Sequence, residues 1–272
     1  DGRQVLSASR DGSARLWQAE GRRHGPVKAH QGAGSSVEYS ADGRYLATAG
    51  EDGALRLWTA EGAPLPLTIG GVAALRSAAF SANGEAVLVA AGDAAEIRDR
   101  ENGAQRVMFK GHRGPVLSAS YARAASRVIT ASEDGTAIVW NADDGSIIST
   151  LGGHADIVRS AALSPDGETA LTTSEDMIAR LWDASSGTLL MELSGHGAGV
   201  GGGAFSPDGS MVVTTSDDAS ARLWETRSGK LLTELAGHKG WVFSAAFSPD
   251  GARVATVSED GAAIIWDVAD GR

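Results

Sequence analysis

The chain has 272 residues, of which 42% are hydrophobic and 21% charged, a balance typical of a soluble globular domain. Its formal net charge of −10, without any Lys/Arg cluster, disfavours nucleic acid as a partner, and no apolar run approaches the roughly 20 residues that a membrane helix needs. Cysteine is absent, which excludes disulfides and thiol chemistry and fits a reducing compartment; we expect a cytoplasmic and, from the Ala- and Gly-rich composition, bacterial protein.

A phrase marked by a Trp near the end of an apolar run recurs along the chain. The marking residues are Trp17, Trp58, Trp140, Trp182, Trp224 and Trp266. Neighbouring Trp residues are 41 or 42 positions apart, except for one double gap of 82 (140 − 58). A degenerate copy with Arg98 in the place of Trp fills this gap, so the sequence predicts seven copies. A period of about 40 to 45 residues indicates one supersecondary unit that is repeated in a ring or array.

Each copy has the pattern of a small antiparallel sheet. In the last copy, residues 241–247, 253–258 and 262–267 are strand-like, and Gly-containing turns at 248–251 and 259–261 separate them. Residues 230–235, from the end of the preceding copy, show the fourth kind of strand. A sheet of this size cannot bury both faces alone, but a closed ring of such sheets can. We predict an all-β fold, a seven-bladed β-propeller of four-stranded antiparallel blades that forms a single domain over residues 1–272.

The two ends of the chain supply incomplete copies. Residues 1–29 provide the last three strands of the first copy, and residues 241–267 provide the first three strands of the last copy. One inner and one outer closing strand are therefore predicted to be missing at the termini. Because the chain begins mid-repeat and without Met, we interpret it as an excerpt of a longer protein that carries other domains.

The recurring phrases resemble those of the WD-repeat β-propeller family. They are Gly-His, as at 237–238, Ser-Pro-Asp-Gly, as at 248–251, and Leu-Trp-Asp, as at 181–183, and the resemblance covers nearly the whole chain. It implies a chain of hydrogen bonds in each blade, from an indole N–H through a hydroxyl and an imidazole to a carboxylate. The residues at these positions are His30, Thr48, Asp52 and Trp58; His112, Thr130, Asp134 and Trp140; His154, Thr172, Asp176 and Trp182; His196, Thr214, Asp218 and Trp224; and His238, Thr256, Asp260 and Trp266.

These repeated sets are interpreted as structural. A Thr, His and Asp could suggest a hydrolase triad, but the same trio occurs five times, and a catalytic site is not repeated in every blade. The sequence lacks a GxSxG, P-loop or HExxH motif, and no His has a His or Cys partner at metal-ligand spacing. We therefore predict no catalytic residue, no metal and no cofactor.

The pattern breaks most clearly in the third copy. Gly71, Val89 and Arg98 replace the His, Thr and Trp there, and only Asp93 remains. Drift in a blade held by its neighbours and an altered contact surface both stay open as explanations. The first turn of the fourth copy, residues 121–126, lacks the Pro-Asp-Gly pattern, and Met177 and Ala219 replace a turn Gly where a positive φ is expected.

The resemblance also implies which positions line the narrow face of the ring: those three and five residues after each His, and the one before each turn Asp. We take the candidate partner-binding residues from these positions: Trp241, Phe243, Glu259, Ile157, Arg159, Glu175, Asp217, Leu117 and Glu133. The acidic members, together with Glu51, would form a ring, with the two aromatic residues as anchors beside it. Two other interpretations stay open: the acids may be no more than solvated turn positions, and Trp241 could pack within its own blade.

The function implied by the resemblance is a non-enzymatic protein-interaction scaffold or sensor module, part of a larger bacterial signalling or regulatory protein. Its expected partner is a protein or peptide, basic or neutral in charge. A purely structural spacer is the first alternative, and a small-molecule-binding or enzymatic propeller is the second. The second would need a convergent set of titratable groups, and the sequence shows none outside the repeated sets.

Overall fold

A computed structural model describes residues 4–9, 11–18, 27–70, 74–122 and 126–271, where the regular elements are β-strands grouped in seven sheets, here named A to G in chain order. Sheet A contains β1 (Gln4–Ala8), β2 (Ser13–Gln18) and β3 (Val27–Lys28). Sheet B contains β4 (Gly34–Tyr39), β5 (Tyr45–Gly50), β6 (Leu55–Thr59) and β7 (Pro64–Ile69). Sheet C contains β8 (Leu75–Phe80), β9 (Ala86–Ala91), β10 (Ala94–Asp99) and β11 (Gln105–Lys110).

The second half of the chain continues the same arrangement. Sheet D contains β12 (Val116–Tyr121), β13 (Arg127–Ser132), β14 (Thr136–Asn141) and β15 (Ile147–Gly152). Sheet E contains β16 (Val158–Leu163), β17 (Thr169–Ser174), β18 (Ala179–Asp183) and β19 (Leu189–Leu193). Sheet F contains β20 (Val200–Phe205), β21 (Met211–Ser216), β22 (Ser220–Glu225) and β23 (Leu231–Ala236). Sheet G contains β24 (Val242–Phe247), β25 (Arg253–Ser258) and β26 (Ala263–Asp267).

The all-β propeller is confirmed, but the prediction of seven four-stranded blades is wrong. Five sheets have four strands, whereas sheets A and G have three each. The described part of the chain thus has 26 strands, enough for six full sets of four with two left over, and seven such blades would need 28. Within that part, no registered strand pair joins sheet A to sheet G. The repeat count overestimated the blades because a copy is recognised by its turn and Trp signals even where its sheet is incomplete.

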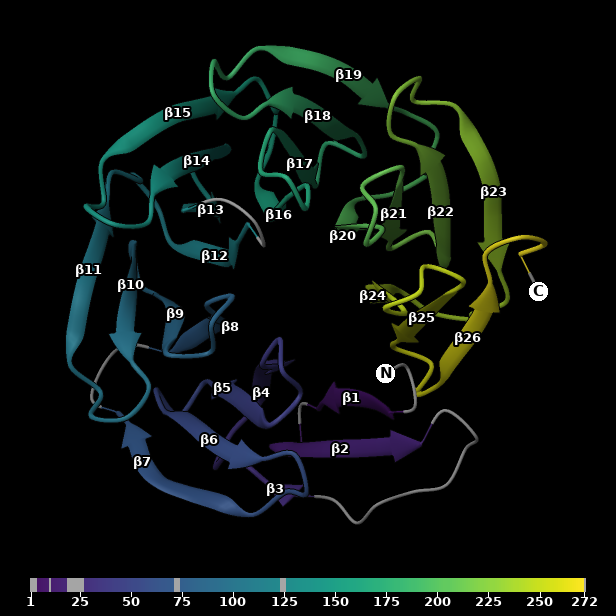
Figure 1. The fold of residues 1–272 in the computed structure, drawn as a ribbon. Coiled ribbons are helices and arrows are strands. Elements are labelled where there is room, and N and C mark those ends of the chain that lie inside the picture. The colour runs from purple at the N-terminus through teal and green to yellow at the C-terminus, as the bar shows by residue number, and fades with distance from the viewer. Residues whose placement is uncertain (1–3, 10, 19–26, 71–73, 123–125, 272) are drawn as a thin grey trace.

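The sheets stand around a ring, with the first strand of each full sheet near the centre and the fourth on the circumference (Figure 1). The pairs are antiparallel, so the connections alternate between the two ends of the ring. We call the narrow face the end that carries the turns between second and third strands and the connections from one sheet to the next. The opposite end, the broad face, carries the turns between first and second and between third and fourth strands.

Hydrophobic side chains between neighbouring sheets form the core. The Trp of each repeat faces back toward the preceding sheet: Trp140 of sheet D packs with Phe109 of sheet C, with ring centroids 5.5 Å apart. Trp182 and Trp224 likewise join clusters built from sheets D and E respectively. The core is therefore a series of interfaces around the ring, and each of sheets B to F is stabilised by both neighbours.

Tight turns at the strand ends fix the register. Met177 and Ala219 have φ values of 67° and 66°, at the turn positions where Gly135 and Gly261 have 80°. Gly71 and the centre of the turn at residues 123–125 lie outside the described residues.

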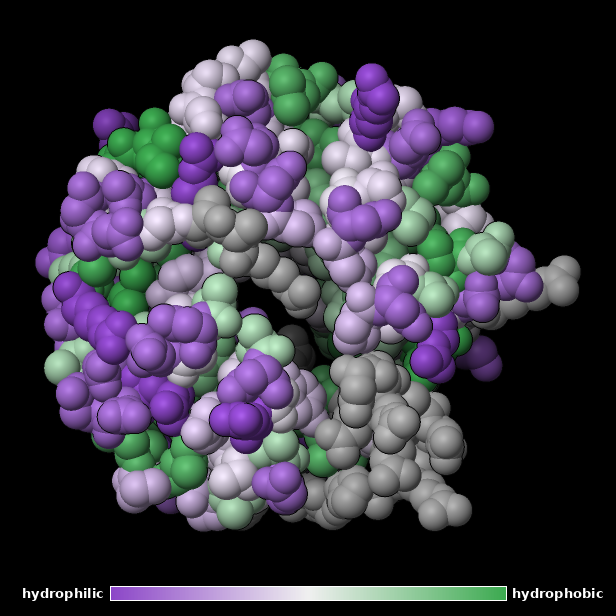
Figure 2. Space-filling model, in the orientation of Figure 1, coloured by the Kyte–Doolittle hydropathy of each residue, from purple (hydrophilic) through white to green (hydrophobic). Residues whose placement is uncertain are grey.

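No helix long and apolar enough to cross a membrane occurs in the described part of the chain. Figure 2 shows hydrophilic and hydrophobic side chains interspersed around this face of the ring, and a hollow near its centre.

Candidate functional site

Sheets D to G each contain the same chain of hydrogen bonds, here called the relay. In sheet E, the indole N–H of Trp182 donates to Thr172 Oγ1 over 2.8 Å. Thr172 Oγ1 lies 2.7 Å from His154 Nε2, and His154 Nδ1 lies 2.9 Å from Asp176. The other relays join Trp140, Thr130, His112 and Asp134; Trp224, Thr214, His196 and Asp218; and Trp266, Thr256, His238 and Asp260. A proton on Nδ1 and a bare Nε2 satisfy all of these bonds at once.

The relay in sheet B is interrupted. Trp58 still donates to Thr48 at 3.1 Å, and His30 Nδ1 still lies 2.9 Å from Asp52. However, His30 Nε2 is buried without a hydrogen-bond partner, and Thr48 Oγ1 contacts the carbonyl of Arg56 instead. The structure therefore brings all four residues of this set together but leaves out the bond between hydroxyl and imidazole.

The burial of the relay decides what it can do chemically. The four Thr residues of the complete relays are 0% exposed, so their hydroxyls cannot reach a substrate as nucleophiles would. Burial lowers the pKa of His154, although Asp176 acts in the opposite direction. For Asp176, burial alone would raise the pKa, but hydrogen bonds from Arg180 and His154 outweigh it and hold the pKa at about 2. The relay of sheet E thus holds a neutral imidazole against a carboxylate, and such a satisfied buried network rigidifies a sheet.

The sequence analysis did not single out an arginine that lies next to several of these His–Asp pairs. Arg180 donates to Asp176 at 2.6 Å, contacts His154 Nδ1, and reaches Glu192 on the outer strand β19 at 2.9 Å. Arg56 makes the matching bond to Asp52 at 2.9 Å. A signal was present, because an Arg follows the turn Asp by four residues at positions 15, 56, 180 and 222.

The position five residues after each His, which in sheet C is five residues after Gly71, has a distinctive backbone geometry. In every sheet from B to G, the pairing of the first and second strands shifts register at this residue, which marks a β-bulge. The bulge residues are Ser35, Arg76, Leu117, Arg159, Gly201 and Phe243. Bulges re-aim side chains and occur next to functional sites. In each of these sheets except F, where the residue is Gly201, the bulge therefore places one variable side chain at the narrow face.

One bulge residue links two sheets. Arg159 Nε donates to Glu175 Oε1 at 2.5 Å within sheet E, and Arg159 Nη2 lies 3.3 Å from Asp217 in sheet F. Gly199 makes room for this pair, since a Cβ there would lie 2.3 Å from Glu175 Oε2. A Cβ at Gly203 would likewise lie 2.7 Å from Leu171. The Gly-rich run thus permits close approach of neighbouring sheets.

The predicted acidic residues differ in their surroundings. Glu51, Glu133 and Glu259 are exposed, whereas Glu175 and Asp217 are half-buried against Arg159. Burial raises the pKa of Asp217; Arg159 opposes this shift, while Glu175 and Glu259 add to it. Asp217 Oδ1 is buried without a hydrogen-bond partner. Glu175, Asp217 and Glu259 therefore lie near enough to act on one another electrostatically.

The two predicted aromatic anchors are among the most exposed large apolar side chains. Trp241 is 46% exposed and Phe243 is 41% exposed. The backbone N–H of Glu259 donates to the carbonyl of Trp241 at 2.9 Å, so the two residues are adjacent at this face. The other apolar candidates, Ile157 and Leu117, are half-buried.

Comparison with known proteins supports the repeat pattern. A family model described as WD domain, G-beta repeat matches residues 1–18, 24–59, 103–141, 145–183, 187–225 and 229–267. The unmatched stretch from 60 to 102 contains β7 to β10, including most of the degenerate sheet C. A comparison with curated proteins finds no match.

Proposed function

Because the chain belongs to the WD domain, G-beta repeat family, whose propellers are generally non-enzymatic and typically serve as protein-interaction scaffolds, we propose that it binds a basic peptide segment of a partner at its narrow face. The family match confirms the resemblance to WD-repeat propellers. The predicted bacterial source, cytoplasmic location and larger signalling parent stay predictions.

The observation that carries this proposal is the pair of exposed aromatic side chains, Trp241 and Phe243, beside exposed Glu259. Exposed Trp is costly in water and is enriched among the residues that dominate binding energy. Most other large exposed apolar residues, such as Leu231 and Leu232, lie on outer strands at the circumference. The aromatic pair therefore favours an apolar anchor of the partner at the narrow face.

The charge of the same face favours a cationic partner. Arg159 is held by Glu175 and Asp217. Glu51, Glu133 and Glu259 are exposed and form no ion pair with a cation in the described part of the chain, so they contribute negative charge. Acidic rims of this kind accelerate the association of basic partners and lose strength at high salt. Lys or Arg side chains on either side of an apolar anchor would match both features.

A selection from random linear peptides displayed on phage tests the proposal. We expect selection against the immobilised chain to enrich peptides with Lys or Arg near an apolar residue. In fluorescence-anisotropy titrations, the Trp241→Ala/Phe243→Ala variant should bind these peptides about 30-fold more weakly, as expected for two anchors that together contribute about 2 kcal/mol.

A matched control is the variant Leu231→Ala/Leu232→Ala, which removes two exposed apolar side chains from the outer strand β23. Its peptide affinity should equal that of the unmodified chain. If both variants lost peptide affinity equally, or both retained it, the result would contradict a narrow-face site. A selection without any enriched peptide would favour the structural spacer.

A further inference from the structure

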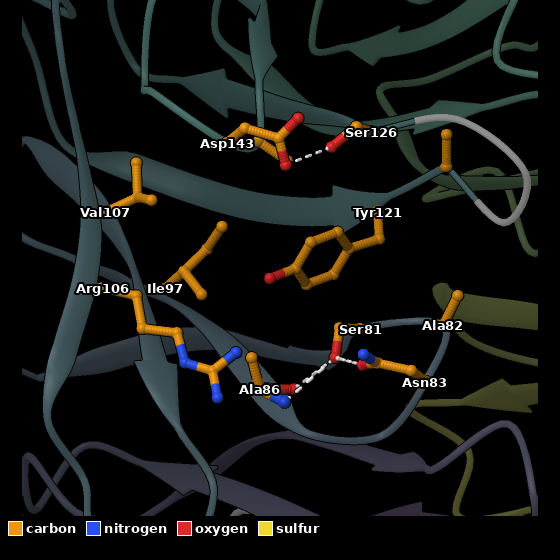
Figure 3. A pocket seen from close by; sticks show the side chains of 12 residues that line it. Ser81, Ala82, Asn83, Ala86, Ile97, Arg106, Val107, Tyr121, Ser126 and Asp143 are labelled. Carbon is orange, nitrogen blue, oxygen red and sulfur yellow. Dashed lines mark hydrogen bonds between the residues drawn. The ribbon is translucent and has the colours of Figure 1, made fainter.

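An open cavity of about 550 Å³ lies between sheets C and D, toward the broad face (Figure 3). Ala86 and Ile97 of sheet C form its floor and are 4% and 5% exposed. The ring of Tyr121 lies across it, and Arg106, Asn83 and Asp143 stand around it. The volume is in the range of small-molecule sites. This cavity lies away from the narrow-face residues and is independent of the function proposed above.

The neighbouring interface shows what normally fills this space. Between sheets B and C, Tyr45 is the first residue of β5, and Arg100 is the residue that follows β10. The guanidinium of Arg100 stacks over the Tyr45 ring at 4.3 Å from its centroid and donates from Nε to the carbonyl of Gly84 at 2.8 Å. An aromatic ring and a cation thus close the interface between these two sheets.

The corresponding positions between sheets C and D are both alanine. Ala86 is the first residue of β9, and Ala142 follows β14. The equivalence is structural, because the backbone N–H groups of Arg100 and Ala142 donate to the matching carbonyls of Glu85 and Ser126, both at 3.0 Å. The volume of a Tyr and an Arg side chain is therefore missing here.

The interfaces D–E, E–F and F–G each carry a larger residue in at least one of these two positions. Arg127 and Ala184 stand between sheets D and E, where Arg127 bonds to the carbonyl of Gly167 and to Ser185. Thr169 and Thr226 stand between E and F, and Met211 and Val268 between F and G. Among the described interfaces, the one with Ala86 and Ala142 has the smallest side chains at these two positions. The cavity lies where this alanine pair occurs.

The charges around the cavity select a cation. Arg106 is neutralised by Asp99, at 2.5 Å. Asp143 is exposed and accepts a hydrogen bond from Ser126 at 2.7 Å, and none of the described cations forms an ion pair with it. Asp143 occupies the position of Glu101, which lies 3.6 Å from the Arg100 guanidinium in the neighbouring interface. A carboxylate therefore stands where a bound cation would need one.

We propose that this cavity binds a small aromatic amine. Its ring occupies the space equivalent to the one that Tyr45 fills in the interface between sheets B and C, and its ammonium group pairs with Asp143. The ring packs on Ala86 and Ile97 against Tyr121, and the hydroxyl of Tyr121 is available to a polar group of the ligand.

Isothermal titration calorimetry with tyramine as the probe tests this site, supported by saturation-transfer NMR on the tyramine ring. Two compounds with the same ring serve as comparison, p-cresol without charge and 4-hydroxyphenylacetate with a negative charge. We expect tyramine to bind most tightly and the Asp143→Asn variant to weaken it about fivefold, the effect of losing one exposed ion pair. Ala86→Tyr should abolish binding because it fills the cavity as Tyr45 fills the neighbouring interface.

The matched control is Asp144→Asn, which removes a neighbouring carboxylate that bonds to Ser146 in the same turn and does not line the cavity. It should leave the tyramine affinity unchanged. If Ala86→Tyr does not fold, Ala142→Arg places the cation itself beside Asp143 and should likewise exclude tyramine. Equal or tighter binding of 4-hydroxyphenylacetate, no measurable binding of tyramine at millimolar concentration, or unaltered binding by both filling variants would overturn the proposal.

Discussion

Sheets C and D are neighbours with the same four-stranded order, but their interiors are stabilised in different ways. Sheet D contains the relay from Trp140 to Asp134. In sheet C, Arg98 replaces the Trp and pairs with Glu96 at 2.6 Å, while its Nη1 donates to the carbonyl of Gly103 at 3.1 Å. Glu96 is 7% exposed. An ion pair within one strand thus replaces a network that joins two strands, the turn between them and the connection from the preceding sheet. The ring tolerates the change because both neighbours pack on the sheet.

The largest expected effect is the loss of the relay tryptophan in sheet D. Trp140→Ala should lower the free energy of unfolding by about 3–5 kcal/mol, because the side chain is fully buried and packs on Phe109 of sheet C. Urea denaturation measures this change. Leu232→Ala, at an exposed position, is the control and should cost less than about 1 kcal/mol. A small effect of Trp140→Ala would show that sheet C does not depend on its neighbour.

The ion pair of sheet C should be less important than the tryptophan but costly to break on one side. Arg98→Met leaves Glu96 buried without its partner and should destabilise by about 2–3 kcal/mol, below the value for fully buried pairs because Arg98 is 21% exposed. The double variant Glu96→Leu/Arg98→Met should return to within about 1 kcal/mol of the unmodified chain. If the double variant were as unstable as the single one, the pair would contribute more to stability than the mutual neutralisation of its two charges.

The relays of sheets E and B differ in one bond, which offers a sharper test. Thr172→Val removes the partner of both Trp182 and His154 and should cost about 2–3 kcal/mol. Thr48→Val should cost only about 1 kcal/mol, because His30 Nε2 has no bond to lose. Chemical denaturation of the two variants gives the difference. Equal costs would indicate that the hydroxyl–imidazole bond contributes nothing to the relay.

The relay residues could be read from the sequence because residue types and spacing repeat together. His154, Thr172 and Trp182 lie far apart in the sequence but at the same separations as their counterparts in four other sheets. The cavity could not be predicted in this way, since Ala86 and Ala142 are ordinary residues whose significance appears only when two sheets face each other. The link from Arg159 to Asp217 likewise depends on the geometry between two sheets, and incomplete strand sets at the ends leave the Trp period unchanged.

The buried imidazoles of sheets D, E and F make the stability of the protein depend on pH, whereas the described residues of sheet C include no buried imidazole. Burial lowers the pKa of His112, His154 and His196 below the ordinary 6.5. A histidine with a lowered folded-state pKa contributes stability above 6.5, and this contribution is lost as the pH falls through the folded-state value. We therefore expect the melting temperature to decrease between pH 7.5 and 5.5. The relay aspartates titrate below this range, so an unchanged melting temperature would contradict neutral, buried imidazoles.

The smallest expected effect concerns the tight turns of sheets E and F, compared with those of D and G. Met177 and Ala219 hold φ values of 67° and 66°, and Gly135 and Gly261 occupy the equivalent turns. A residue with a Cβ pays about 1 kcal/mol or more in this region. Glycine removes that strain but gives the unfolded chain more freedom, which costs about 0.4–1 kcal/mol. Met177→Gly and Ala219→Gly should therefore each stabilise by no more than about 0.5 kcal/mol in urea denaturation. A clear loss at Met177 alone would indicate that its half-exposed side chain makes contacts worth more than the strain.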